Sequence, residues 1–233
     1  MIDLRLGDCL ELMREMPDAS VDAVITDPPY NVSRENNFAT MERYNSYKGI
    51  DFGEWDKGFN QTDWIARAAP KLKVDSNIVI FNSWQNLGLI AECLQANGIN
   101  AKRPIVIKKR NPVPTNRDRM FVSSFEFGLW GARGKWTFHR MHKFEEAFLE
   151  ANGGHGETEH PTEKYLPNII TLIATLTNEG DTILDPFMGS GTTGVACVKL
   201  NRNFIGMEIN LDYFAIAQRR IADAQKQPAL VMA

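Results

Sequence analysis

The chain has 233 residues and a formal net charge of −3, and 43% of its residues are hydrophobic. This composition is typical of a globular protein, and a single domain spanning residues 1–233 is expected. No apolar run reaches the roughly 20 residues that a membrane-spanning helix needs, and the N-terminus lacks a secretory signal pattern. Three widely spaced cysteines argue against a disulfide framework and a cysteine-based zinc site, and no metal is expected. We therefore expect a cytoplasmic protein.

Strand and helix patterns alternate along the chain. In chain order they predict a strand at residues 2–6, a helix at 9–16, a strand at 21–26, a helix at 62–72, a strand at 77–81, a helix at 87–96, strands at 105–107 and 125–130, a helix at 166–176, a strand at 182–184, a helix at 192–200, a strand at 204–207 and a helix at 211–224. This alternation predicts an α/β fold with a mostly parallel central sheet and helices on both faces.

Two stretches do not fit the alternation. Residues 31–60 have no clean period and are rich in Asn, Gly and aromatic residues, so we expect a mobile loop beside a functional site. Residues 135–159 contain a Gly-Gly pair and are expected to form a small insertion outside the sheet.

Four predicted strands carry a carboxylate at or just after their carboxyl ends. These residues are Asp8, Asp27, Asp185 and Glu208. Ligands bind along this edge of an open α/β sheet. A single acid there is most often a helix cap, but four on one edge favour a site that offers several hydrogen-bond acceptors.

Residues 189–194, which we call the glycine loop, match the pattern G-x-G-x-x-G. Glycines let the backbone approach a ligand closely, and the N-terminus of the following helix favours a carboxylate or phosphate. No lysine follows, which excludes a Walker-type loop. Glu208 could accept both hydroxyls of a ribose. The loop therefore indicates nucleoside binding, with tight strand–helix packing as the alternative.

The sequence Asp27-Pro28-Pro29-Tyr30, here called the acceptor turn, directly follows a predicted buried strand. The two prolines remove two N–H donors, so carbonyl oxygens and the Asp27 carboxylate form an acceptor surface. Tyr30 adds a flat ring. This combination suits the exocyclic amino group of a planar base, while an ordinary turn is the alternative.

Together these motifs resemble the S-adenosylmethionine-dependent DNA amino-methyltransferases of the permuted β class, which occur in restriction-modification systems. The resemblance rests on the acceptor turn, on the run from Asp185 through the glycine loop, and on His160-Pro161-Thr162-Glu163-Lys164. It covers nearly the whole chain and implies a Rossmann-like methyltransferase fold with circularly permuted motif order. It also implies site-specific methylation of adenine N6 in DNA, because many cytosine-N4 enzymes have Ser where this chain has Asp27.

The resemblance implies roles for individual residues. The catalytic set is Asp27, Pro28, Pro29 and Tyr30, with Tyr30 stacking on a base flipped out of the duplex. Lys164 and a helix beginning at Pro161 would hold the methionine carboxylate of the cofactor. The residues expected to bind S-adenosylmethionine are Asp8, Cys9, Asp27, His160, Thr162, Lys164, Asp185, Phe187, Gly189, Ser190, Gly191, Thr192 and Glu208. Residues 135–159 would form the target-recognition region.

Positive charge is concentrated in residues 100–143, where eleven Lys and Arg face two acids, a net charge of +9. The ordinary explanation for such a charged stretch is a solvated face. The more specific explanation is a surface that binds the phosphates of DNA. The residues predicted to contact DNA are Lys108, Lys109, Arg110, Arg117, Arg119, Arg133, Lys135 and Arg140.

Other functions remain open at this point. Within the amino-methyltransferases, the alternatives are cytosine-N4 methylation and an RNA or single-stranded substrate. Outside that class, the alternatives are a non-catalytic DNA- or nucleotide-binding module and a nicotinamide oxidoreductase. A dehydrogenase, however, has no use for the acceptor turn. Because no cysteine follows a proline, the sequence argues against cytosine-C5 methylation. A homodimer is a further expectation, and any restriction nuclease would be a separate chain.

Overall fold

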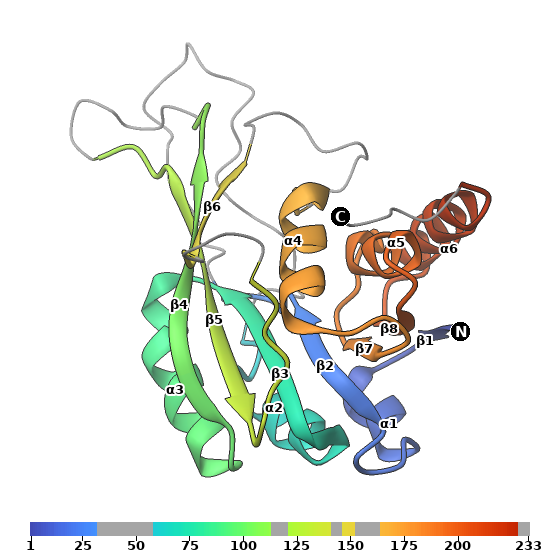
Figure 1. Ribbon diagram of the computed structural model, residues 1–233, viewed down its shortest axis with the longest axis horizontal. Helices are drawn as coiled ribbons and strands as arrows, with labels where there is room; N and C mark the ends of the chain where they lie inside the picture. The colour runs from blue at the N-terminus through green and yellow to red at the C-terminus, as the bar shows by residue number, and fades with distance from the viewer. Residues whose placement is uncertain (32–57, 113–120, 141–145, 152–163, 228–233) are drawn as a thin grey trace.

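The computed structural model describes residues 1–31, 58–112, 121–140, 146–151 and 164–227, and all structural statements concern these residues. Within them, eight strands form one sheet in the order β1-β8-β7-β2-β3-β5-β4-β6 (Figure 1). Of these strands, only β5 runs antiparallel to its neighbours. The strands are β1 (Ile2–Leu6), β2 (Val21–Thr26), β3 (Leu72–Asn82), β4 (Asn100–Lys109), β5 (Phe125–Arg133), β6 (Phe148–Ala151), β7 (Thr182–Asp185) and β8 (Asn203–Glu208).

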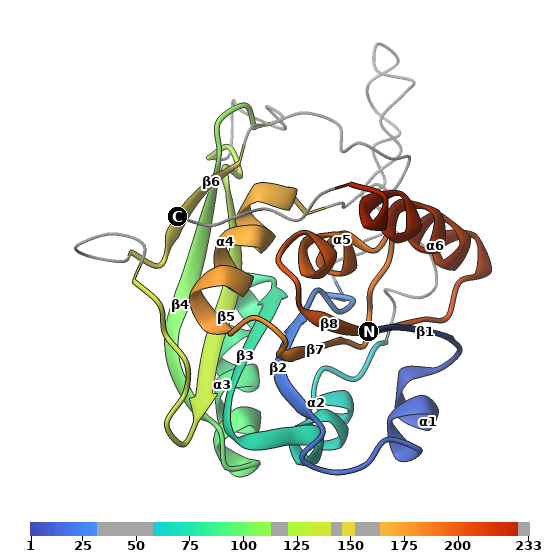
Figure 2. The same ribbon diagram turned by 45° about the vertical axis from the view of Figure 1, so that its right-hand side comes forward.

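Helices cover both faces of the sheet, as the alternation predicted (Figure 2). One face carries α1 (Cys9–Arg14), α2 (Asp63–Ala68) and α3 (Leu87–Ala96), and the other carries α4 (Leu166–Leu176), α5 (Thr192–Lys199) and α6 (Leu211–Gln225). Short 3-10 turns lie at η2 (Ala69–Lys71) and η3 (Trp84–Asn86). No helix in these described ranges is long and apolar enough to cross a membrane.

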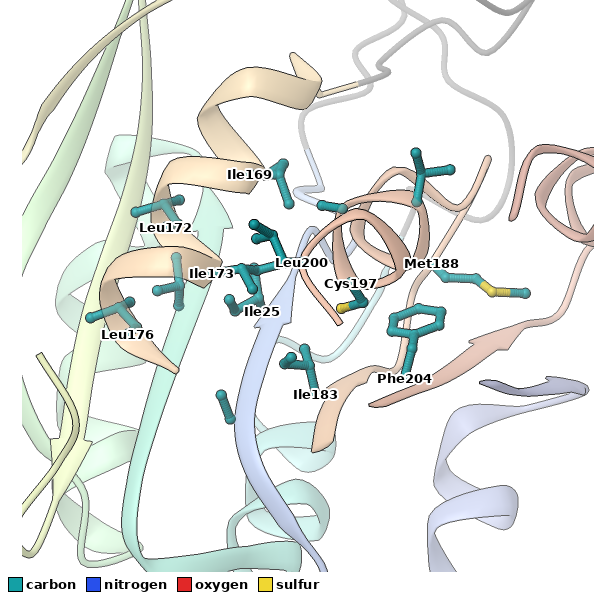
Figure 3. Packing of buried hydrophobic residues seen from close by; sticks show 14 of the residues in the cluster. Ile25, Ile169, Leu172, Ile173, Leu176, Ile183, Met188, Cys197, Leu200 and Phe204 are labelled. Carbon is teal, nitrogen blue, oxygen red and sulfur yellow. The ribbon is translucent and has the colours of Figure 1, made fainter. Parts of the chain in front are cut away.

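The central strand β2 is apolar on both sides because each side meets a layer of helices. Ala23 and Ile25 belong to the core beneath α4, α5 and α6, whereas Val21 and Val24 belong to the core beneath α1, α2 and α3. Figure 3 shows the first core, in which Ile173 of α4 lies close to Ile25. Such two-sided burial explains the nearly continuous apolar run of this strand.

The sheet changes direction of growth between β2 and β7. From β2 the chain adds β3 on one side, and from β7 it adds β8 on the other. Such switch points leave a crevice at the carboxyl ends of the strands, where α/β proteins bind their ligands. The ends of β2 and β7 therefore define the position of the site.

The structure differs from the predicted elements in several places. Residues 148–151 were expected outside the sheet but form β6, which pairs in parallel with β4. Four residues are too few to show a period, so this strand gave no sequence signal. The predicted helix at 62–72 ends at Ala68, where Pro70 continues it only as a 3-10 turn. Strand β4 begins at Asn100, five residues before the predicted start. Most of the expected loop at 31–60 lies outside the described residues.

Candidate active site

Four neighbouring strands bring four carboxylates to one edge. The sheet order β1-β8-β7-β2 places Asp8, Glu208, Asp185 and Asp27 side by side at the carboxyl ends. Glu208 and Asp185 are the last residues of β8 and β7, whereas Asp27 and Asp8 follow β2 and β1. The prediction of one acid-rich edge is therefore confirmed.

Asp27 lies in a cluster of charged and hydroxyl groups. Its Oδ2 accepts a hydrogen bond of 2.5 Å from the Lys164 ammonium, and its Oδ1 accepts from the Tyr30 hydroxyl. The Lys164 Nζ is also 3.2 Å from the Tyr30 hydroxyl and 3.9 Å from Glu126 Oε2. Only 11% of the Lys164 side chain is exposed. The sequence predicted Asp27 and Tyr30 here and Lys164 at the cofactor, but no pattern in it indicated that Lys164 would pair with Asp27 or that Glu126 would join them.

The protonation states of the cluster follow from its charges. Burial, and then the negative charge of Asp27, raise the pKa of Tyr30 well above its usual value. Burial acts to lower the pKa of Lys164, but Asp27, Tyr30 and Glu126 outweigh it and raise that pKa. Burial acts to raise the pKa of Glu126, yet Lys164 and Lys109 lower it. At neutral pH the cluster thus contains a neutral phenol and an ammonium ion that faces carboxylates.

The glycine loop has a backbone that only glycine adopts easily. Gly189 and Gly191 have φ values of 51° and 82°, in the left-handed region. A Cβ on Gly191 would lie 2.9 Å from the Cβ of Ala217 on α6. The Gly189 N–H donates to Glu208 Oε2 at 3.0 Å, and the Asn210 N–H donates to Glu208 Oε1 at 2.8 Å. The loop is therefore tied to the carboxylate predicted to bind ribose.

Arg220 of α6 binds residues of the glycine loop. Its guanidinium donates to the Ser190 carbonyl at 2.8 Å, to Ser190 Oγ at 2.9 Å and to Thr192 Oγ1 at 3.2 Å. Nothing in the sequence pattern distinguishes Arg220 from the other polar residues of an amphipathic helix. Its role becomes visible only through packing between residues about 30 positions apart.

Asp185 joins the glycine loop to the acceptor turn. Only 3% of this residue is exposed, and its Oδ1 accepts from Thr26 Oγ1 at 2.6 Å and from the Phe187 N–H at 3.1 Å. Burial raises the pKa of Asp185 to about 6. Because Thr26 immediately precedes Asp27, this bond holds the two motifs next to each other.

The other predicted cofactor residues have local partners. Asp8 caps α1 by accepting from the Leu10 and Glu11 N–H groups at 2.7 and 3.3 Å. Burial, and then the charge of Asp8, raise the pKa of the Cys9 thiol to about 12. Phe187 packs edge-to-face on Phe59 and Trp64, with ring centroids 5.4 Å apart in each pair. The contacts of these residues with a cofactor stay predictions.

The predicted DNA-binding residues are divided between two edges of the sheet. Lys108, Lys109 and Arg110 lie at the edge that bears Asp27, because β4 runs parallel to β3. Lys109 pairs with Glu126 at 2.7 Å and Arg110 with Glu150 at 2.5 Å, so much of this positive charge is neutralised.

Arg133 lies toward the opposite edge, opposite Ser76 of β3. Its guanidinium donates to the backbone carbonyls of Ala69, Leu72, Asn97 and Gly98 at 2.8–3.4 Å. These bonds give the Arg133 guanidinium a structural role that a count of charges cannot show, and its contact with DNA stays a prediction.

Lys135 lies at the same far edge, where its backbone N–H donates to Asp75. Arg140 is exposed. Four further predicted residues fall outside the described residues, namely His160, Thr162, Arg117 and Arg119.

The fold and the site define an α/β protein that joins a glycine loop for a nucleoside to an acceptor surface for an amino group. Comparison with known proteins agrees with this class. The family model described as DNA methylase matches residues 21–219. The chain belongs to this DNA methylase family.

Two curated relatives are similar over most of their length. The Type II methyltransferase M2.MboI of Moraxella bovis is 32% identical over 235 residues, which cover 92% of this chain and 85% of the relative. The Type II methyltransferase M2.DpnII of Streptococcus pneumoniae is 30% identical over 239 residues, which cover 92% and 87%.

Solved structures show the same fold. The crystal structure of an M1.HpyAVI–SAM complex superimposes with a TM-score of 0.77 at 36% identity and covers 94% of this chain and all of that one. The cytosine-N4-specific PvuII DNA methyltransferase superimposes with a TM-score of 0.74 at 18% identity, covering 97% and 91% of the two chains. The predicted methyltransferase fold and family are thus confirmed.

Proposed function

We propose that this protein is a site-specific DNA methyltransferase that transfers a methyl group from S-adenosylmethionine to the N6 amino group of adenine. The observation that carries the proposal is the hydrogen bond between Thr26 and Asp185, which holds the acceptor turn beside the glycine loop. The two curated relatives, M2.MboI and M2.DpnII, are Type II methyltransferases. The structure of M1.HpyAVI, which is 36% identical to this chain, is a complex with SAM.

The residues of the glycine loop fit S-adenosylmethionine. The Glu208 carboxylate accepts the Gly189 N–H and the Asn210 N–H on different oxygens, and the Ile209 N–H also interacts with it. A carboxylate has about four acceptor positions, so acceptor capacity is left for the ribose hydroxyls. The left-handed glycines would let the backbone approach the methionine portion closely. The bound cofactor supplies an activated methyl group on a sulfonium.

The acceptor turn prepares the other reactant. The lone pair of the adenine amino nitrogen is delocalised into the ring, and acceptors on both N–H groups favour a more localised lone pair. Asp27 and the Pro28 carbonyl serve as these acceptors. Direct transfer then depends mainly on positioning, because well-oriented reactants gain a large part of the rate from proximity alone. No covalent intermediate on the protein is needed.

Removing the Glu208 carboxylate is expected to weaken cofactor binding. Glu208→Ala should reduce the affinity for S-adenosylmethionine by about 1–3 kcal/mol, the usual effect of losing a charged hydrogen-bond partner. Isothermal titration calorimetry measures this change. Glu208→Gln is the matched control, since it keeps one acceptor and should retain part of the affinity. An unchanged dissociation constant in Glu208→Ala would move the ribose site elsewhere.

The product of the reaction tests the base assignment. DNA from cells that express the protein should contain N6-methyladenine at defined sequence positions, as measured by nucleoside analysis and by sequencing that detects methylated bases. Cells that express Asp27→Ala provide the background. If the DNA contained only N4-methylcytosine, the methyl-transfer chemistry would stand and the target base would change.

The macromolecular substrate is DNA, and its phosphates would meet the sheet edge that carries Lys108. The homodimer, the cytoplasmic location and the role of residues 135–159 in target recognition stay predictions. Gel filtration of the free protein and of its DNA complex would establish the assembly.

A further inference from the structure

The acceptor turn is anchored through its carbonyl oxygens. Its two prolines have no N–H to donate, so the backbone of the turn bonds to neighbouring side chains mainly through its carbonyl oxygens. The Pro29 carbonyl accepts from Gln61 Nε2 at 2.7 Å, and the Tyr30 carbonyl accepts from Asn86 Nδ2 at 3.0 Å. Two amide side chains from different parts of the chain therefore hold two consecutive peptide carbonyls of the acceptor turn.

Asn82, the last residue of β3, connects these two anchors. Its Nδ2 donates to Gln61 Oε1 at 2.9 Å, and its Oδ1 accepts from Asn86 Nδ2 at 2.7 Å and from the Ser83 N–H at 2.8 Å. Only 1% of Asn82 and 7% of Gln61 are exposed. Gln61 and Asn82 each use both the donor and the acceptor of their amides, and Asn86 donates twice from Nδ2, so the network fixes the orientation of all three side chains.

We propose that Asn82 is a positioning residue for methyl transfer, acting on the acceptor turn through Gln61 and Asn86. This inference rests on the proposed function, in which the acceptor turn receives the target amino group. The residue needs no contact with the base or the cofactor. The network also anchors the turn with neutral groups, so it adds no further charge to the cluster of Asp27, Lys164 and Glu126.

The strand β3 offers a matched control in its middle. Asn77 is 2% exposed, and its amide donates to the carbonyls of Thr137 and Leu176 at 2.9 and 2.8 Å and accepts from Trp130 Nε1 at 2.9 Å. Asn77 and Asn82 thus have equal burial and a similar number of bonds, but only Asn82 is linked to the acceptor turn.

The test compares Asn82→Ala with Asn77→Ala in single-turnover methyl transfer to duplex DNA. Both variants should lower the melting temperature, because each removes a buried, fully bonded amide. Only Asn82→Ala should lower the methyl-transfer rate, by about 10- to 100-fold, since a small misplacement of reacting groups costs that much. Its affinity for S-adenosylmethionine, measured by calorimetry, should stay that of the parent protein.

A double-mutant cycle separates positioning from general damage. In a Gln61→Ala/Asn86→Ala background the link to the turn is already broken, so adding Asn82→Ala should change the rate less than about twofold. If Asn82→Ala does not fold, Asn86→Ala serves as the milder variant and should lower the rate alone, because it removes the anchor of the Tyr30 carbonyl.

Three results would decide against the inference. An unchanged rate in Asn82→Ala, or an equal loss of rate in Asn77→Ala, overturns the positioning role while the proposed function stands. A parent protein that transfers no methyl group to DNA overturns the proposed function and the positioning role together.

Discussion

Asp27→Ala is expected to lose more than about 100-fold in the rate of methyl transfer, the loss typical of a positioned group that contacts the reacting atoms. The variant removes one of the two acceptors for the target amino group. Single-turnover transfer of a labelled methyl group to duplex DNA measures the effect. The affinity for S-adenosylmethionine should change far less, because Asp27 is only one of the residues predicted to bind it, and Glu208 and the glycine loop remain in place.

Asp27→Ala also changes the charged cluster, so a control must separate loss of catalysis from loss of structure. Asp27 accepts from both Lys164 and Tyr30, so alanine leaves the ammonium with the Tyr30 hydroxyl, 3.2 Å away, and Glu126, 3.9 Å away, as its partners in the cluster. Asp27→Asn keeps the size of the side chain and one acceptor, and its rate should lie between those of alanine and the parent. Melting temperatures of both variants show whether they are folded. Turnover in Asp27→Ala equal to that of the parent would refute the catalytic role.

The fold was predictable where the local sequence pattern and the tertiary environment favour the same secondary structure. The apolar run at residues 21–26 is buried from both sides, so its period and composition identify β2 without ambiguity. Strand β6 has four residues and half-exposed side chains, and only its pairing with β4 makes it a strand. The antiparallel direction of β5 likewise depends on pairing with β3 and β4, which no local pattern records.

The site was predictable to the same extent. Acids after strands reach one edge through topology alone, so the strand pattern was enough to place Asp8, Asp27, Asp185 and Glu208 together. The partner of Asp27 could not be found in this way, because Lys164 is 137 residues away and arrives just before α4. Arg220 and Asn82 are visible only as hydrogen bonds formed after the chain has folded.

Replacing Lys164 by methionine is expected to slow methyl transfer and to shift its pH dependence. The Lys164 ammonium forms an ion pair with Asp27 and lowers the pKa of Glu126, 3.9 Å away. Without this charge Glu126 takes up a proton at higher pH. Because Glu126 shares the cluster with Asp27, the acid limb of the pH–rate profile should move to higher pH.

The control is Lys164→Arg, which keeps the positive charge and should keep the acid limb where the parent has it. The same variants discriminate between two roles for Lys164. If its ammonium acts on the acceptor turn through Asp27 and Glu126, Lys164→Met changes the pH profile and leaves the affinity for S-adenosylmethionine close to that of the parent. If instead it binds the methionine carboxylate, as the sequence motif predicted, calorimetry will show weaker cofactor binding while the acid limb stays in place. A shifted acid limb with unchanged cofactor affinity would assign Lys164 to the acceptor turn, where the 2.5 Å bond to Asp27 places it.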